Sequence, residues 1–166
     1  MINDMNKLAE ENLSEGAALL DYQTQRLQGL ISEMVHCCQD RMVFQSQKFD
    51  LPQAELRCLM LFGDERYLTV KSIAQRLEVA KSRVTKILEG MEARGLVSRT
   101  DDPQDGRIRL ISLTPEGRRR AQQIGGFLRD VHQRILLQFE EDQRLEIIGA
   151  LESLRTAMEV VKQGLK

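Results

Sequence analysis

Five polar side chains between residues 81 and 86 have the chemistry needed to contact nucleic acid. They are Lys81, Ser82, Arg83, Thr85 and Lys86. Lysine and arginine attract phosphates and can donate hydrogen bonds to guanine in the major groove, and the hydroxyls of serine and threonine can bind several bases. If one helix presents these residues on its exposed face, that face can enter a DNA major groove.

The apolar residues of the same stretch predict such a helix. Four of them recur at intervals of three or four residues and must face inward: Val84, Ile87, Leu88 and Met91. At about 100° per residue, Ser82 and Lys86 then point the opposite way, with Arg83 and Thr85 on the flanks. A shorter helix after Thr69 and a turn at residues 78–80 precede it, which is the order of a helix-turn-helix.

A predicted β-hairpin follows and carries a second basic pair. Residues 96–100 and 108–113 are rich in β-branched side chains and are joined by the polar loop 101–106. Arg107 and Arg109 lie two apart on the returning strand, so they are expected to share a face. Gly106 is expected to supply conformational freedom near the tip. Residues 68–117 therefore predict a helix-turn-helix followed by a hairpin, or wing.

Charge is unevenly distributed along the chain. The whole sequence has a formal net charge of −1, but residues 66–120 contain 13 Lys and Arg against seven Asp and Glu. The basic excess therefore lies on the segment that was predicted from its side chains to bind DNA.

Long amphipathic helices are predicted on both sides of this segment, at about 14–48, 53–62, 115–139 and 141–163. The first would be roughly 45–50 Å long, too long for one small core to cover. We therefore expect the ends of the chain to dimerise through seven apolar residues: Leu20, Leu27, Ile147, Leu151, Leu154, Met158 and Val161. The expected fold is mainly α with a small β-wing, a winged helix-turn-helix on a helical dimerisation scaffold. Its regions are 1–49 (dimerisation), 50–117 (DNA-binding lobe) and 118–166 (dimerisation).

Several segments in this order resemble the multiple-antibiotic-resistance regulator (MarR) family of winged-helix transcription factors. They are LPQAELRCLMLF, LTVKSIAQRLEVAKSRVTKILEGMEARGLVSR, and DPQDGR followed by LTPEG. The resemblance extends over most of the chain and is strongest from residue 51 to 117. It implies a homodimer that reads a pseudo-palindromic operator in double-stranded DNA and acts as a repressor.

The resemblance also implies roles for individual residues. Ser82, Arg83, Thr85 and Lys86 match the positions that enter the major groove. Arg107 matches a wing arginine attracted into the narrow minor groove, with Asp105 as the acid expected to orient it. A small effector such as an aromatic acid is expected between the dimer helices and the lobe, lined by the first helix and residues 53–62.

Three positions depart from the family pattern. Ala80 stands where a Ser or Thr usually caps the recognition helix, a loss of about 1 kcal/mol. Lys81 stands where proline is common, and Gln104 stands where the wing often has another arginine.

The cysteines leave a second mode of regulation open. Cys37 and Cys38 are adjacent, so on a helix they point about 100° apart, which suits neither chelation nor an intrachain disulfide. A structural role is expected for Cys38, on the apolar stripe, and for Cys58. The alternative is a thiol-based redox sensor of the same fold.

Other classes of function have less support in the sequence. No metalloprotease, phosphate-binding-loop, nucleophile-elbow or dinucleotide motif is present, so we expect no enzyme activity, no cofactor and no metal. A winged-helix protein-interaction module without DNA binding would need apolar anchors on the exposed helix face, and this face is polar. No signal peptide or membrane span is recognised, which predicts a cytoplasmic protein without a membrane partner.

Overall fold

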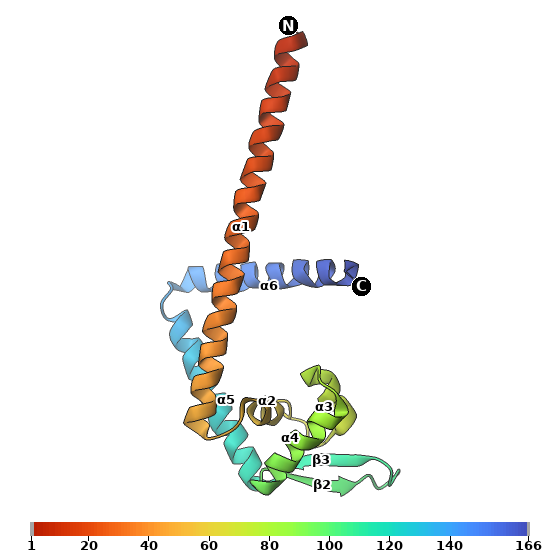
Figure 1. Ribbon diagram of the computed structural model, residues 1–166. Coiled ribbons are helices and arrows are strands. Elements are labelled where there is room, and N and C mark those ends of the chain that lie inside the picture. The colour runs from red at the N-terminus through yellow and green to blue at the C-terminus, as the bar shows by residue number, and fades with distance from the viewer. Residues whose placement is uncertain (1, 166) are drawn as a thin grey trace. The chain divides into compact units, whose positions relative to one another are not determined.

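The computed structural model describes residues 2–165, and the side chains of residues 15–165, as mainly helical with one small antiparallel sheet (Figure 1). This confirms the predicted fold class. The chain divides into two compact units, residues 1–56 and 57–166, which are described separately. Among the described residues, no helix is both long and apolar enough to span a membrane.

The first unit is dominated by helix α1 (Ile2–Phe49), which begins well before the predicted start near residue 14. Asp50 ends it with a left-handed φ of 49°. The N–H of Leu51 donates to the carbonyl of Ser46 over 3.1 Å, and the Ser46 hydroxyl donates to the carbonyl of Leu51 over 2.6 Å. Pro52 follows, and α2 (Gln53–Met60) starts directly after it, at the start predicted for the helix at 53–62 and ending two residues earlier.

In the second unit, β1 (Leu68–Thr69) leads into α3 (Val70–Leu77). The Thr69 hydroxyl accepts from the Ser72 N–H, and the Ser72 hydroxyl accepts from the Thr69 N–H, at 3.1 and 3.0 Å. This reciprocal capping box confirms Thr69 as the start of the helix. Glu78 ends α3 with a left-handed φ of 55°, which opens the turn to α4 (Lys81–Ala93).

Helix α4 begins without a side-chain cap, because Ala80 occupies the N-cap position and offers no acceptor. Replacing Ala80 with serine should therefore raise the free energy of unfolding by about 1 kcal/mol, since a serine hydroxyl could accept from a free N–H in the first turn. Urea denaturation followed by circular dichroism measures this change. Ala80→Val is the matched control and should give no gain; an equal gain in both variants would disprove the capping explanation.

The wing consists of β2 (Val97–Asp101) and β3 (Arg109–Leu113), each starting one residue later than predicted. Val97 pairs with Leu113 and Asp101 with Arg109. Strand β1 pairs with β3 on the other side, giving the order β1-β3-β2. The sequence did not predict this third strand, because two residues carry no alternation. The wing is thus joined through β1 to the start of α3.

The core of the second unit lies between the two helices of the helix-turn-helix and the inner face of the sheet. Its fully buried side chains, each less than 2% exposed, are Cys58, Leu59, Phe62, Ile73, Val84, Leu88, Met91, Ile111 and Ile124. Cys58 is thereby confirmed as a structural cysteine. The burial of this core fixes the direction of the opposite, polar face of α4.

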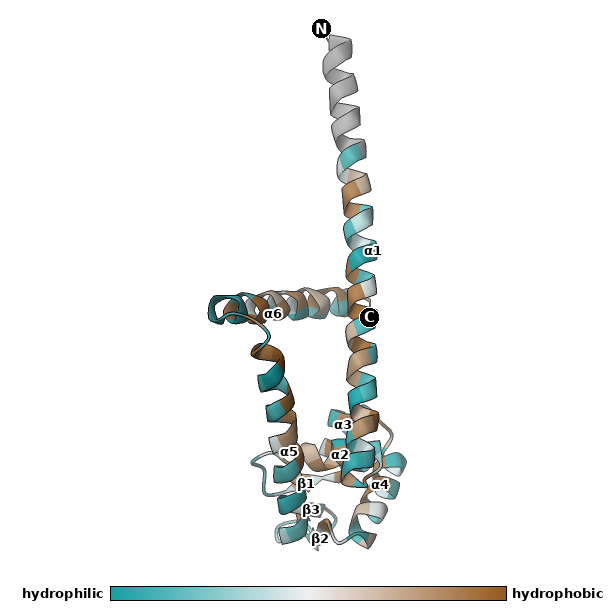
Figure 2. Ribbon diagram, turned by 90° about the vertical axis from the view of Figure 1, so that its left-hand side faces the viewer, coloured by the Kyte–Doolittle hydropathy of each residue, from teal (hydrophilic) through white to brown (hydrophobic). Residues whose placement is uncertain are grey.

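Two helices follow the wing, α5 (Pro115–Leu136) and α6 (Glu141–Gly164). The Thr114 hydroxyl accepts from the Gly117 N–H over 3.0 Å and donates to the carbonyl of Gly95 over 2.6 Å, so Thr114 is the N-cap of α5 and ties its start to Gly95. Helix α6 has no buried residue, although hydrophobic residues recur along it (Figure 2).

Candidate nucleic-acid interface

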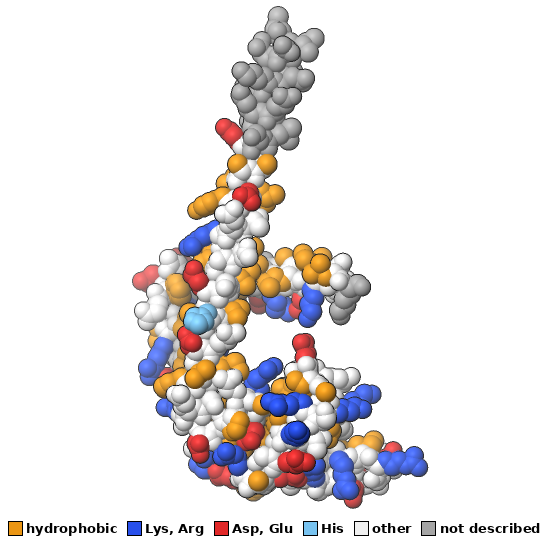
Figure 3. Space-filling model, viewed as in Figure 1, with side chains coloured by type: hydrophobic (Ala, Val, Ile, Leu, Met, Phe, Trp, Pro, Cys, Tyr) orange, Lys and Arg blue, Asp and Glu red, His pale blue; other side chains and the backbone are white. Residues whose placement is uncertain are grey.

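Helix α4 presents the predicted basic face to solvent. Its inner residues Val84, Ile87, Leu88 and Met91 are at most 7% exposed, which confirms the predicted orientation of the helix. Lys81, Ser82, Arg83 and Lys86 are exposed, and Thr85 is half-buried. Figure 3 shows Lys and Arg side chains gathered over α3, α4 and the tip of the wing.

The exposed side chains of α4 differ in whether they already have a partner. The Thr85 hydroxyl donates to the carbonyl of Lys81 over 3.1 Å, so its proton is used within the helix. Within the described part of the chain, no side-chain hydrogen bond or ion pair engages Lys81, Ser82, Arg83 or Lys86. Two lysines, an arginine and a serine are therefore available to an external acceptor.

The wing differs from the prediction at its tip. Arg107 lies in the turn before β3 rather than on the strand, so the expected shared face with Arg109 was wrong. Asp105 accepts from the backbone N–H of Arg107 over 3.0 Å. It therefore shapes the turn instead of orienting the guanidinium. Among the described residues, the Arg107 side chain has no hydrogen bond or ion pair, which leaves its charge free at the tip.

Gly106 also behaves differently from the prediction. It is not among the described residues with positive φ, and a Cβ added to it would meet no atom within 4 Å. Glycine is therefore not required there by backbone conformation or space. The turn is instead supported by Asp102, whose carboxylate accepts from the backbone N–H of Gln104 over 2.8 Å.

The second predicted wing arginine already has a partner within the hairpin. Arg109 Nη1 lies 2.7 Å from Asp101 Oδ1, and the two residues face each other across the strands. Both side chains are well exposed, so this pair contributes little to stability, but it offsets the positive charge of Arg109. Arg107 and Arg109 therefore differ in how much of their positive charge is available to bind DNA.

An ion pair that sequence reasoning missed joins the wing to the recognition helix. Arg99 of β2 lies 2.9 Å from Glu92 near the end of α4. Nothing in the spacing of these two residues reveals the contact, because it depends on how β2 packs against α4. Both side chains are half-buried, so the pair can hold the wing at a fixed angle to the helix.

The arginine run after the wing, residues 118–120, is largely occupied by contacts inside the protein. The Arg119 guanidinium donates to both carboxylate oxygens of Glu116, over 2.8 and 2.6 Å. Arg120 also donates to Glu116, over 3.3 Å, and Arg118 donates to the carbonyl of Leu113 over 2.7 Å. These contacts favour the reading of a solvated helix face over a row of phosphate ligands.

The hydrogen bonds from Arg119 lower the pKa of Glu116 below its ordinary value. A carboxyl group with a lowered folded-state pKa contributes stability above its unfolded-state pKa, and this contribution is lost as the pH falls through the folded-state value. We therefore expect the Glu116 carboxyl carbon to titrate at a lower pH than an ordinary glutamate in a model peptide, as measured by side-chain NMR. A normal titration midpoint for Glu116 would contradict the observed pairing.

A short strand, two helices of which the second has an exposed basic face, and a two-stranded wing with an arginine at its tip define a winged helix-turn-helix protein. Residues 49–108 match the family model described as MarR family. Over 129 residues, which are 77% of this chain and 83% of the relative, the sequence is 29% identical to the HTH-type transcriptional repressor MdtR of Bacillus subtilis.

The structural similarity covers nearly the whole length of solved structures that have the same fold. A MarR family protein from Bacillus stearothermophilus has a TM-score of 0.75 and 19% identity, covering 84% of this chain and 97% of its own. FabT of Streptococcus pneumoniae, solved in complex with DNA, has a TM-score of 0.72 and 19% identity, covering 81% and 98%. The family-model match, the relatives and the fold together support a MarR-family winged-helix regulator that binds DNA. Its relatives are regulators and not enzymes, in agreement with the sequence.

Proposed function

We propose that the protein is a homodimeric repressor that binds a pseudo-palindromic operator in double-stranded DNA and releases it when a small effector binds. The observation that carries the proposal is the unpaired basic face of α4 beside the unpaired Arg107. Lys81, Ser82, Arg83, Thr85 and Lys86 would contact the major groove, and Arg107 the adjacent minor groove. A bacterial regulator that binds chromosomal DNA would act in the cytoplasm, because the chromosome lies there.

The relatives support this proposal through what their names state. MdtR is named a transcriptional repressor, and FabT was solved in complex with DNA. Charged and hydroxyl side chains on the exposed face of α4 also disfavour a protein-interaction module, because such a module needs apolar anchors at that place.

The homodimer is supported by apolar residues that stay exposed or half-buried in the described part of the single chain. Leu20 is 64% exposed and Leu27 is 44% exposed on α1, while Leu151, Met158 and Val161 are 49–63% exposed on α6. Ile147 and Leu154 are half-buried on the same stripe of α6. Leu151, Leu154 and Met158 share one shallow groove. A second copy could cover these residues and remove their apolar surface from water, as in other symmetric dimers.

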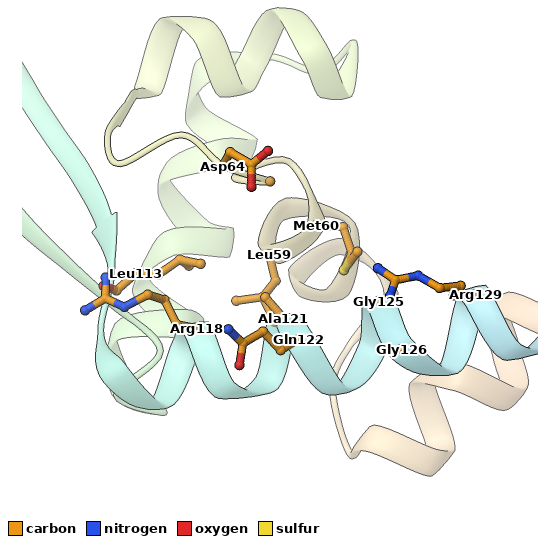
Figure 4. Close-up of a pocket in the computed structure, with 11 residues that line it drawn as sticks. Leu59, Met60, Asp64, Leu113, Arg118, Ala121, Gln122, Gly125, Gly126 and Arg129 are labelled. Carbon is orange, nitrogen blue, oxygen red and sulfur yellow. The ribbon is translucent and has the colours of Figure 1, made fainter.

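A cleft between α2 and the first half of α5 is the candidate effector site (Figure 4). Its volume is about 420 Å³, within the range of small-molecule pockets. Leu59, Met60 and Leu113 supply apolar lining, Arg118 and Arg129 supply positive charge, and Asp64 is the one carboxylate among the lining residues. An apolar ring with a carboxylate matches two arginines beside aliphatic side chains. Two of its lining residues, Leu59 and Met60, come from the segment 53–62 that was expected to line an effector site, whereas no residue of α1, the other expected segment, lines this cleft.

The test of DNA binding is selection of bound duplexes from a random pool by the purified full chain, followed by sedimentation of the complex. We expect a sequence with two related half-sites about one helical turn apart and two protein chains per duplex. Binding should weaken steeply with salt, because lysine and arginine contacts release counterions. Failure to enrich any duplex at low salt, or one chain per site, would refute the proposal.

The dimer has its own test, in which Leu151→Asp is compared with Glu152→Asp on the same helix. The first places a charge in the apolar groove and should raise the dimer dissociation constant by at least tenfold, while the second should not. Sedimentation equilibrium measures both. If Leu151→Asp dimerises as well as the parent chain, the interface lies elsewhere.

Oxidation of a thiol is a second candidate trigger, because Cys37 and Cys38 are both exposed in the single chain. Cys38 would therefore have the buried, structural role expected for it only if another chain covers its side chain. Mild alkylation of the purified dimer followed by mass spectrometry distinguishes oxidant sensing from sensing of a small molecule. Rapid modification of either thiol would favour oxidant sensing, whereas inert thiols would leave the small-molecule effector as the trigger.

A further inference from the structure

A hollow on the outer face of the sheet is lined by two arginines and several hydroxyl groups. Its volume is about 310 Å³. Val97, Ile111 and Leu113 are buried on the inner face of the sheet. The residues that alternate with them, Ser98 and Ser112, therefore face the other side, where both line the hollow. The hollow thus lies on the side of the sheet turned away from the core and from α4.

The lining of this hollow is positively charged. Arg66 and Arg118 both line it, and none of its eight described lining residues is acidic. The acid that is nearest to it along the chain, Glu116, already accepts hydrogen bonds from Arg119 and Arg120. Two positive charges therefore meet in one hollow whose lining supplies no carboxylate to offset them.

The protein holds both guanidinium groups while leaving most of their donors unused. Arg118 Nη1 donates to the carbonyl oxygen of Leu113 over 2.7 Å, and the other N–H groups of this guanidinium remain available. Figure 4 shows the same guanidinium beside Leu113, at the end of the effector cleft away from Arg129. The Arg66 guanidinium lies over the ring of Tyr67, 5.2 Å from its centroid. Within the described part of the chain, Arg66 has no hydrogen bond or ion pair from its side chain.

The two serines add a further donor. The hydroxyl oxygens of Ser98 and Ser112 lie 3.0 Å apart across β2 and β3, so one hydroxyl donates to the other. Each hydroxyl has one proton, and only one of the two protons is used in this bond. The second proton can be donated to a ligand in the hollow.

We propose that this hollow binds a phosphate monoester. The planar fork of a guanidinium binds two phosphate oxygens at once, and two forks with a hydroxyl can engage the several oxygens of one phosphate group. A monoester carries close to two negative charges at neutral pH, which matches Arg66 and Arg118. A carboxylate has two oxygens and one charge, which a single guanidinium satisfies. Tyr67 and Pro115 supply apolar lining for the organic part of the ligand.

The place of the hollow favours a small ligand over a phosphate of the operator. Ser112 lies three residues along β3 from Arg109, about 10 Å at 3.3 Å per residue, and Arg107 lies beyond Arg109. Figure 1 shows α5 beginning at the end of the sheet opposite the loop of the wing. A duplex that contacts α4 and the tip of the wing is therefore expected to lie away from the hollow. This inference goes beyond operator binding and does not depend on it.

The experiment titrates the full chain with glycerol 3-phosphate, a monoester without an aromatic ring, and with dimethyl phosphate, a diester with a single charge. Calorimetry gives the dissociation constants, and amide NMR spectra show where each compound binds. We expect saturable shifts at residues 66, 67, 98, 112 and 118. The monoester should bind at least about tenfold more tightly than the diester, because charge-assisted bonds to the second guanidinium are lost with the second charge.

Arg66→Met is the informative variant, and Arg129→Met is its matched control. Arg66 is exposed and has no ion pair among the described residues, so its loss should not disturb folding. Arg66→Met should weaken binding of glycerol 3-phosphate about tenfold or more, whereas Arg129→Met, which changes only the effector cleft, should leave it unchanged. Arg66→Lys keeps the charge but not the fork and should give an intermediate loss.

Three results would overturn the inference. They are the absence of saturable shifts at the lining residues, equal affinity for the monoester and the diester, and unchanged affinity in Arg66→Met. Operator binding supplies a separate test of the phosphate source, because Arg66→Met should leave the salt slope of operator affinity unchanged. A slope reduced by about one would show that the hollow holds an operator phosphate instead of a small ligand. Failure of the wild-type protein to bind any duplex would defeat the proposed function but not this site.

Discussion

Replacing Gly117 with alanine should destabilise the protein by at least about 3 kcal/mol. A Cβ at position 117 would lie 1.9 Å from the carbonyl oxygen of Leu96 and 2.9 Å from its carbonyl carbon. Both are backbone atoms, so neither can rotate away. The same Leu96 oxygen accepts the N–H of Thr114 over 3.0 Å, which holds the start of α5 against β2.

Gly126 provides the matched control, because it lies in the same helix and an added Cβ would meet no atom within 4 Å. Gly126→Ala should stabilise the protein by about 0.5–1 kcal/mol, since alanine loses less backbone entropy in a helix. Urea denaturation of both variants measures the difference. Equal stability of the two variants would show that the close approach of α5 to β2 is not present in solution.

Replacing Arg107 with alanine should weaken operator binding by about 10- to 100-fold while leaving the dimer intact. This is the range expected when a well-placed base or minor-groove contact of about 1–3 kcal/mol is lost. The large effect follows from the position of Arg107 at the tip of the wing, with no partner for its side chain among the described residues. Fluorescence anisotropy on the selected operator at several salt concentrations gives both the affinity and the salt slope.

Arg109→Ala is the comparison that the structure supplies for this prediction. Arg109 is two residues away and carries the same charge, but it is paired with Asp101 at 2.7 Å. Its loss should weaken operator binding only a few-fold, because the pair is nearly neutral from a distance. If Arg109→Ala costs as much as Arg107→Ala, the pairing does not decide which arginine serves DNA binding; if neither matters, the wing is not part of the interface.

The sequence predicted most of the helices because their signals are local. The period of Val84, Ile87 and Leu88 fixed which face of α4 is exposed, and Thr69 marked the start of α3 through a side-chain cap that acts within three residues. Ala80 was recognised as an uncapped start in the same way. In each of these places the interacting residues lie within about one helical turn, so the interaction can be predicted from the sequence alone.

The wing was harder to predict because its contacts join residues far apart in the chain. The two-residue strand β1 has too few residues for an alternation, and its pairing with β3 depends on the fold around it. The prediction that Arg107 and Arg109 share a face assumed that the strand began before residue 109. When a strand begins one or two residues later than predicted, different side chains belong to the strand and share its faces.

The sequence by itself determined that this chain has a helix-turn-helix, a wing and a basic face on its second helix, because periodicity, caps and charge are properties of neighbouring residues. Only the tertiary structure decided which cations are free to act. Arg109, Arg119 and Arg118 are held by Asp101, Glu116 and the Leu113 carbonyl, whereas Arg107 is not. A charge becomes available or occupied through its distance to a partner, and folding sets that distance.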